Sequence, residues 1–214
     1  MFVTSYMTKT PITVSTDTLI PAAREILKKN GFRHLPVTGP DGKILGMVTD
    51  RDIRSAYPSS VLDETEKKQI LDKVKAMPVS SIMSTELSCL NLRSTIDDAL
   101  ISLDKQNIGA LPVVDDSSKV IGIFSIRDLM KAYGELFGLY EKGSALVSVE
   151  NETSDTMSKA LKVLEARAIP FTRVIKATHP VEDGKMQEVI HIRVQTMNLP
   201  SVKEALKDAG LKLL

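Results

Sequence analysis

The amino-acid sequence repeats itself once at a fixed offset of 76 residues, and this repeat strongly limits how the first two thirds of the chain can fold. The Leu-Pro-Val run at residues 35–37 recurs at residues 111–113, and the Arg-Asp pair at 51–52 recurs at 127–128. Residues 7–57 align with residues 83–133 without a gap. Because each copy spans only about 50 residues, neither can enclose a full core alone. We therefore expect two copies of one supersecondary unit that pack against each other.

Hydrophobic spacing within each copy predicts the element order β-α-β-β-α. In the second copy, apolar residues at positions 96, 99, 100 and 103 have the spacing of an amphipathic helix. Gly31 and Asn107 follow this helix in the two copies, and both residue types tolerate the left-handed backbone that ends helices. Short strands are expected at residues 12–14, 35–38 and 44–48 in the first copy, and at 111–114 and 120–124 in the second. A further helix is expected to begin after Thr49 and after Ser125.

The remaining sequence predicts a helical insertion between the copies and a separate C-terminal domain. Residues 60–75 are rich in charge but also carry Val61, Ile70, Leu71 and Val74, and we interpret them as a solvated helix at the rim of the repeat pair. From residue 144 onwards, the patterns predict a strand at 145–149, a helix over 157–164, β-rich runs at 171–177 and 189–196, a helix over 202–209 and a last short strand at 211–214. The turn sequence Glu182-Asp183-Gly184-Lys185 joins the two β-rich runs as a hairpin. This β-α-β-β-α-β order is that of a ferredoxin-like sandwich, whose small size favours pairing of its open sheet with a second chain.

The pattern Gly-x-x-Thr/Ser-x-x-Asp closes both copies and carries the candidate chemistry. It places Thr49 or Ser125 at the end of a strand, and Asp52 or Asp128 in the first turn of the next helix. A helix N-terminus attracts anions such as phosphate, and an aspartate there can accept hydrogen bonds from both hydroxyls of a ribose. The motif glycines, at positions 46 and 122, would let a ligand approach the backbone closely. The same hydroxyl and carboxylate also form a capping box, which needs no ligand, so both interpretations stay open.

The paired units, with their Leu-Pro-Val strands and Gly-x-x-Thr/Ser-x-x-Asp ends, resemble a tandem CBS-domain pair, or Bateman module, over residues 1–135. The resemblance implies an adenine nucleotide (AMP, ADP or ATP) or an S-adenosylmethionine-type ligand in clefts between the two copies. It also implies ribose recognition by the aspartates, phosphate contacts from the hydroxyls and from a basic residue before the Leu-Pro-Val strand, and adenine contacts near residues 10–13 and 86–89. The candidate ligand-binding residues are Thr10, Ile12, Thr13, Arg33, His34, Leu35, Pro36, Thr49, Arg51, Asp52, Glu86, Leu87, Ala110, Leu111, Pro112, Ser125, Arg127 and Asp128.

The two copies differ immediately before the Leu-Pro-Val strand. Arg33 and His34 in the first copy correspond to Gly109 and Ala110 in the second. Only the first copy therefore offers a cationic pair at this place, and the geometry of a guanidinium suits phosphate. If these residues contact a ligand, the two clefts should differ in affinity or in preferred ligand. The sequence does not determine which cleft they serve, and both residues are also compatible with an exposed loop.

The C-terminal part resembles an ACT domain, a fold whose dimers often bind amino acids at a subunit interface. Residues 150–155 contain no glycine where amino-acid-binding members usually have one, so dimerisation is favoured over amino-acid sensing. Two CBS units followed by an ACT-like tail are similar to acetoin-utilisation AcuB-type proteins, which implies a regulatory role around acetoin or acetyl-CoA metabolism. The expected parts are residues 1–58 (first CBS unit), 59–77 (helical insertion), 78–135 (second CBS unit) and 143–214 (ACT-like domain).

Composition and residue spacing argue against several other classes of protein. Lys and Arg number 28 against 27 Asp and Glu, so the chain lacks the basic excess that is typical of nucleic-acid binders. The single cysteine, Cys89, excludes a disulfide framework and is expected to be a small buried residue rather than a nucleophile. His179 and His191 are expected to approach each other across the hairpin, but without a third ligand they make a poor metal site. No apolar run has the length of a membrane span and the first residues lack a signal-peptide pattern, so a cytoplasmic location is expected.

The sequence therefore predicts an α/β protein that acts as a homodimeric, non-enzymatic sensor of an adenosyl ligand and acts on an unidentified regulated partner. One Ser-x-x-Lys match, at residues 102–105, lies on a helix whose apolar face is assigned to the core, which argues against a catalytic role. Two alternatives are kept. One is a ligand-free dimerisation scaffold whose motifs only cap helices, and the other is an enzyme or nucleic-acid binder that carries the CBS pair as an accessory.

Overall fold

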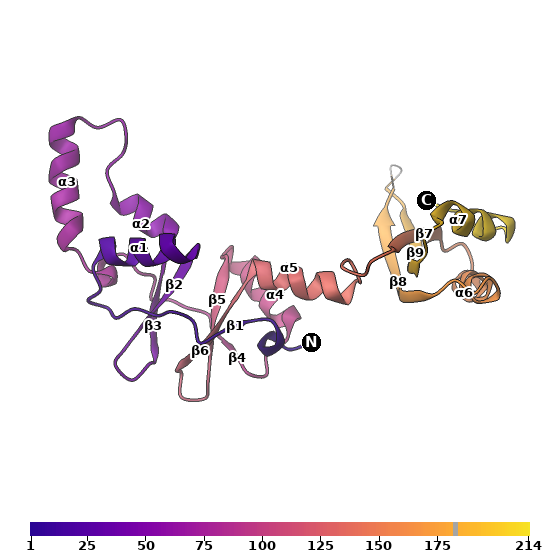
Figure 1. Ribbon diagram of the computed structural model, residues 1–214, viewed down its shortest axis with the longest axis horizontal. Helices are drawn as coiled ribbons and strands as arrows, with labels where there is room; N and C mark the ends of the chain where they lie inside the picture. The colour runs from indigo at the N-terminus through magenta and orange to yellow at the C-terminus, as the bar shows by residue number, and fades with distance from the viewer. Residues whose placement is uncertain (182–183) are drawn as a thin grey trace. The chain divides into compact units, whose positions relative to one another are not determined.

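The computed structural model of the chain describes residues 1–181 and 184–214. These residues form two compact units, Met1–Ala132 and Tyr133–Leu214 (Figure 1). We call them unit 1 and unit 2. The boundary between them falls within one helix, α5, so the two units are consecutive along the chain and share no exchanged segment.

Unit 1 contains the two repeat copies and the insertion. The first copy comprises β1 (Thr8–Lys9), α1 (Ile20–Asn30), β2 (His34–Thr38), β3 (Ile44–Thr49) and α2 (Asp50–Ala56). The insertion forms α3 (Glu64–Ala76). The second copy comprises β4 (Leu90–Asn91), α4 (Ile96–Gln106), β5 (Ala110–Val114), β6 (Val120–Ser125) and α5 (Ile126–Leu136). Two short 3₁₀ helices, Val3–Ser5 and Val79–Ser81, begin the copies.

Most local predictions for unit 1 are confirmed, and one strand is misplaced. Gly31 and Asn107 end α1 and α4 with φ of 65° and 51°, as their left-handed tolerance predicted. The strand expected at residues 12–14 is wrong, because only Val14 pairs there, through an isolated parallel bridge to Val37. The first strand lies earlier, at β1. A two-residue strand has too weak a local signal to be found from hydrophobic spacing.

The two copies exchange their first segments. Strand β1, at the start of the first copy, pairs with β6 of the second copy, where Thr8 lies opposite Ile123. In return Ser84, from the start of the second copy, bridges to Met47 on β3 of the first copy. The resulting sheets have the orders β1-β6-β5-β4 and β2-β3 (Figure 1). Each copy therefore completes a sheet edge of the other, as expected for repeats too small to fold alone.

The insertion is packed more closely than expected. Asp63 caps α3, its carboxylate accepting a hydrogen bond of 2.8 Å from the Glu66 N–H. Val74 on this helix is only 2% exposed and joins the core of the first copy, and Ile70 packs against the same core. The predicted helix is confirmed, but it is not solvated on this face, because two apolar side chains on adjacent turns pack against that core.

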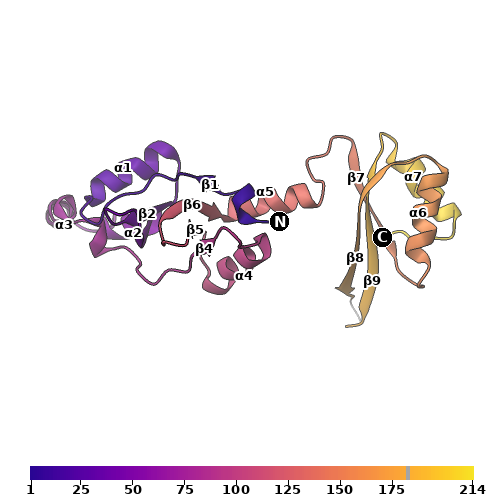
Figure 2. The same cartoon turned by 90° about the horizontal axis from the view of Figure 1, so that it is seen from below.

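Unit 2 is a three-stranded antiparallel sheet with two helices on one face. Its elements are β7 (Ser144–Glu150), α6 (Thr156–Ala166), β8 (Phe171–Pro180), β9 (Met186–Gln195) and α7 (Leu199–Asp208), and the sheet order is β7-β9-β8. Both helices lie on the same side of the sheet (Figure 2), over buried side chains such as Ile190, Ile192 and Leu206. The expected last strand is reduced to one bridge from Leu213 to Val149, and the turn residues Glu182 and Asp183 lie outside the described part of the chain.

Candidate functional site

The two Gly-x-x-Thr/Ser-x-x-Asp motifs adopt the same capping geometry. At the junction of β3 and α2, the Thr49 hydroxyl donates a hydrogen bond of 2.7 Å to Oδ2 of Asp52, and the Thr49 N–H donates one of 2.8 Å to the same oxygen. The Asp52 N–H donates back to the Thr49 hydroxyl at 3.2 Å. Ser125 and Asp128 repeat this arrangement between β6 and α5, with distances of 2.7, 2.8 and 3.4 Å. Both motifs therefore cap helices, as one of the two interpretations required.

Helix capping uses only half of each carboxylate. Oδ2 of Asp52 and Oδ2 of Asp128 accept the capping bonds, while the Oδ1 atoms accept none from the described residues 1–181 and 184–214. A carboxylate oxygen can accept two hydrogen bonds, so capping leaves the capacity that a ribose diol needs. The hydroxyl hydrogens of Thr49 and Ser125 point to the aspartates, so a phosphate contact from these groups requires that hydrogen to turn away.

Each aspartate lies on the wall of a cavity in unit 1. The first cavity, of about 700 Å³, contains the Thr49–Asp52 junction and residues from the start of the second copy. The second, of about 460 Å³, contains the Ser125–Asp128 junction and residues from the start of the first copy. The predicted residues on the first wall are Arg33, His34, Thr49, Arg51, Asp52, Glu86, Leu87, Ala110 and Pro112. Those on the second are Thr10, Ile12, Arg33, His34, Pro36, Ala110, Ser125, Arg127 and Asp128.

Three predicted residues lie away from both cavities. Leu35 and Leu111 are 0% exposed, because alternate side chains of β2 and β5 point into the core. The Thr13 hydroxyl lies 3.4 Å from that of Thr38, to which it is hydrogen bonded, and Thr13 is on neither wall. The prediction of Leu35 and Leu111 follows the Leu-Pro-Val motif, which does not separate the two faces of the strand, and that of Thr13 follows the segment expected to contact adenine.

The motif glycines leave space for the exchanged segments rather than for a ligand. A Cβ on Gly46 would lie 2.5 Å from the Met83 sulfur, and a Cβ on Gly122 would lie even closer to the Met7 sulfur. Met7 and Met83 occupy equivalent positions in the two copies, each crossing a strand of the other copy. The expectation that these glycines admit a ligand is therefore wrong, because the space beside them is filled by methionine.

The residues at the starts of β2 and β5 line both cavities. Arg33, His34, Gly109 and Ala110 line the first cavity and also the second. Burial lowers the pKa of His34, the Arg33 charge lowers it further, and the Asp52 charge opposes this. His34 is thus neutral near pH 7, which leaves the Arg33 guanidinium as the cation of this shared wall.

Sequence reasoning missed several wall residues that the repeat offset could have found. Thr8 lines the second cavity and Ser84 lines the first, at equivalent positions of the exchanged segments. Phe32 and Ile108 are likewise equivalent and lie on opposite cavities. These residues add polar and apolar side chains to the walls of the two cavities.

In the described part of the chain, the reactive side chains outside the cavities do not gather into a second candidate site. Cys89 is exposed, so its expected burial is wrong, although partial burial still raises the pKa of its thiol. The Nε2 atoms of His179 and His191 lie 3.0 Å apart, which confirms their approach across the hairpin. Among the described residues, no three His, Cys, Asp or Glu side chains gather as a metal site would require. No helix in the same residues is long and apolar enough to span a bilayer.

Comparisons with known proteins agree with this arrangement. The CBS domain model matches residues 3–59 and 79–135, together more than half of the chain. A CBS domain-containing protein of Dictyostelium discoideum is 33% identical over 130 residues, which cover 61% of this chain and 89% of that protein. An L-aspartate semialdehyde sulfurtransferase of Methanocaldococcus jannaschii is 29% identical over 128 residues, but these span only 22% of that enzyme.

Two solved structures share the fold. The CBS domain pair of protein MJ0100, in complex with 5′-methylthioadenosine and S-adenosyl-L-methionine, matches 63% of this chain and all of that chain, with 29% identity and a TM-score of 0.52. A protein of Vibrio cholerae described as an acetoin utilization protein (AcuB) matches 66% of this chain and 96% of that chain, with 23% identity and a TM-score of 0.55. Unit 2 has no counterpart in the matched family model, which ends at residue 135.

Proposed function

The chain belongs to the CBS-domain family, and from this premise we propose that it is a regulatory sensor that binds an adenosyl ligand in the two cavities of unit 1. The observation that carries this proposal is the placement of Asp52 and Asp128. Each caps a helix through one oxygen, keeps the other oxygen unused by the described residues, and lines a cavity. Helix capping alone does not require that the carboxylate line a cavity.

The composition of the walls suits the parts of an adenosyl ligand. The free carboxylate oxygens accept hydrogen bonds from the ribose hydroxyls. Apolar side chains on the walls, such as Leu87 in the first cavity and Ile12 and Phe32 in the second, provide surfaces against which adenine can pack. Arg51 and Arg127 begin helices beside the two aspartates and supply positive charge for a phosphate or a carboxylate.

The matched structures support an adenosyl ligand but do not identify the group attached to its 5′ position. Protein MJ0100, at 29% identity, holds 5′-methylthioadenosine and S-adenosyl-L-methionine in its CBS pair. These two molecules share the adenosyl group and differ in charge. We extend the same group to this chain, with AMP, ADP, ATP and S-adenosylmethionine-type molecules as the candidates.

Thermal unfolding against a panel of these ligands tests the proposal. A ligand that binds only the folded state raises its stability, by about 2.7 kcal/mol when its concentration is a hundred times the dissociation constant. We expect one or more adenosyl ligands to raise the unfolding temperature, and the Asp52→Ala/Asp128→Ala double variant to lose that response. A flat panel with the unsubstituted protein would instead favour the ligand-free scaffold, which the capping geometry also permits.

For unit 2 we propose an ACT-type, ferredoxin-like fold that holds two chains together. Its β-α-β-β-α order, the β7-β9-β8 arrangement and the bridge from Leu213 to β7 support this topology. A ligand with different affinities for two arrangements of the CBS copies would shift their equilibrium, and the dimer would pass this shift to a regulated partner. The partner belongs, in this proposal, to acetoin or acetyl-CoA metabolism. Light scattering on the full chain tests the dimer, and a monomer at all concentrations would contradict it.

A further inference from the structure

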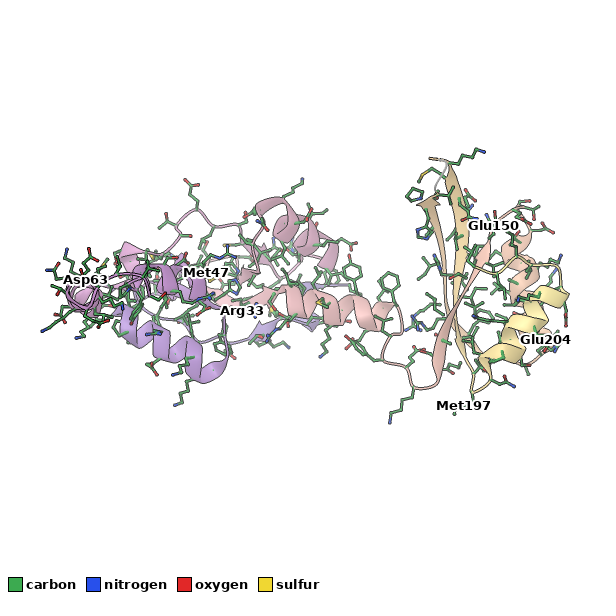
Figure 3. All side chains as sticks on the ribbon, turned by 90° about the horizontal axis from the view of Figure 1, so that it is seen from above. Arg33, Met47, Asp63, Glu150, Met197 and Glu204 are labelled. Carbon is green, nitrogen blue, oxygen red and sulfur yellow. The ribbon has the colours of Figure 1, made fainter. Side chains whose placement is uncertain are left out.

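The shared wall between the two cavities contains one cationic side chain. Arg33 lines both cavities, near the middle of unit 1 (Figure 3). In the second copy its equivalent is Gly109, which has no side chain. The Arg33 guanidinium makes no hydrogen bond or ion pair with any residue in the described part of the chain, so it is available to a ligand on either side.

The His34 ring lies against Gly109, the position equivalent to Arg33 in the second copy. A Cβ built on Gly109 would lie 2.8 Å from Cε1 and 2.9 Å from Nε2 of the His34 ring. The His34 side chain therefore occupies the space that any larger residue at position 109 would need. With the His34 ring in this place, a side chain at position 109 would require the ring to move, and the shared wall carries its cation on the first copy.

Backbone hydrogen bonds hold both strand starts in place. The Asp50 N–H donates to the Arg33 carbonyl at 3.0 Å, and the Ile126 N–H donates to the Gly109 carbonyl at 3.1 Å. Position 33 is thereby fixed against the helix of the first cavity, and position 109 against the helix of the second. Of the four residues that line both cavities, Arg33 alone has a long charged side chain, and one guanidinium binds one phosphate in a bidentate manner at a time.

Each cavity also has at least one arginine side chain that the other cavity lacks. Arg51 and Arg127 occupy equivalent positions, one in each cavity, so their contributions to phosphate binding cancel when the two cavities are compared. Arg54 in the first cavity is already paired with Asp50 at 2.9 Å. A phosphate in either cavity therefore has an arginine of that cavity, Arg51 or Arg127, and gains a second guanidinium only by recruiting the shared Arg33.

Building on the proposed function, we propose that the two cavities compete for Arg33. A phosphorylated adenosyl ligand in one cavity then lowers the affinity of the other cavity for a second phosphorylated ligand. Uncharged adenosyl ligands, which have no use for the guanidinium, fill the two cavities independently. Unit 1 would thus respond to the combination of an anionic and an uncharged adenosyl ligand rather than to two copies of an anionic one.

Calorimetric titration of the full chain with AMP and with uncharged 5′-methylthioadenosine tests the competition. Asp52→Ala and Asp128→Ala each disable one cavity and give the affinity of the other cavity alone. We expect the second AMP to bind the unsubstituted protein at least about tenfold more weakly than it binds that same cavity alone, the order of one charge-assisted hydrogen bond. For 5′-methylthioadenosine, we expect the two affinities to equal those of the single cavities.

Arg33→Gln provides the decisive variant. It should weaken AMP binding to each cavity measured alone, leave 5′-methylthioadenosine unchanged and abolish the difference between first and second AMP. Arg93→Gln is the matched control, because Arg93 is an exposed arginine of unit 1 that lies on neither cavity wall. Two AMP molecules that bind independently would overturn the competition while leaving the sensor intact, whereas no binding of either ligand would overturn both proposals.

Discussion

A helix-capping aspartate and the proposed ligand-binding aspartates share the Thr/Ser-x-x-Asp pattern, and unit 1 offers an aspartate to test each role. Thr95 and Asp98 cap α4 with hydrogen bonds of 2.8, 2.8 and 3.1 Å, nearly the same geometry as at Thr49 and Asp52. Asp98 is absent from both cavity walls, whereas Asp52 lines the first. The chain therefore supplies its own control for separating the two roles.

We predict that Asp52→Ala and Asp98→Ala have similar effects on stability and different effects on ligand binding. Each variant keeps its N-cap threonine and loses the N3 carboxylate of the capping box, whose hydrogen bonds contribute about 1 kcal/mol to the unfolding free energy. Only Asp52→Ala should also reduce the thermal shift caused by an adenosyl ligand. The measurement is chemical unfolding of both variants with and without the ligand. Equal ligand responses in the two variants would show that Asp52 only caps α2.

The stability contributed by Asp98 should depend on pH. Hydrogen bonds from the N–H and the hydroxyl of Thr95 lower the pKa of Asp98 in the folded protein below the ordinary aspartate value. This contribution is therefore present above the pKa of unfolded aspartate, about 3.9, and is lost as the pH falls through the lower pKa of the folded state. Asp98→Asn should be destabilising near pH 7 and approach the unsubstituted protein in acid. Unfolding curves at several pH values check this, and a constant difference down to the acid limit would contradict it.

At the scale of elements, the contact between Gly122 and Met7 fixes β1 against β6. Gly122 does not have a positive φ, so what restricts this position is space and not backbone conformation. We predict that Gly122→Ala destabilises unit 1 by about 1–3 kcal/mol, because the added methyl overlaps the Met7 side chain. In a Met7→Ala background the same change should cost little. A double-mutant cycle measured by urea unfolding gives the coupling, and additive effects would show that the methionine side chain simply moves aside.

Elements with strong local signals were predictable, and those made by exchange between the copies were not. The helices α1 and α4 have apolar residues at helical spacing and a left-handed residue at their ends, so the sequence determines them locally. Strand β1 has two exposed residues, and nothing nearby in the sequence shows that it pairs with β6. The misplacement of the strand to residues 12–14 follows from this difference.

The candidate site shows the same division at the scale of the whole molecule. The aspartates and their hydroxyl partners could be found because the motif occurs twice at one offset. That Arg33 lines both cavities could not be predicted, because it depends on how the starts of β2 and β5 meet in space. The asymmetry between Arg33 and Gly109 was visible, but its reason, the position of the His34 ring, was not.

The exchange of segments also predicts that the two copies unfold together, separately from unit 2. Leu35 is 0% exposed in the core of the first copy, so Leu35→Ala should cost about 2–5 kcal/mol. Because β1 completes the sheet of the second copy and Ser84 extends that of the first, this loss should reach β5 and β6. Hydrogen exchange of the variant should therefore accelerate at the amides of both copies and stay unchanged at β9 in unit 2. Acceleration confined to the first copy would mean that each repeat is a separate folding unit, and acceleration at β9 would mean that units 1 and 2 unfold as one.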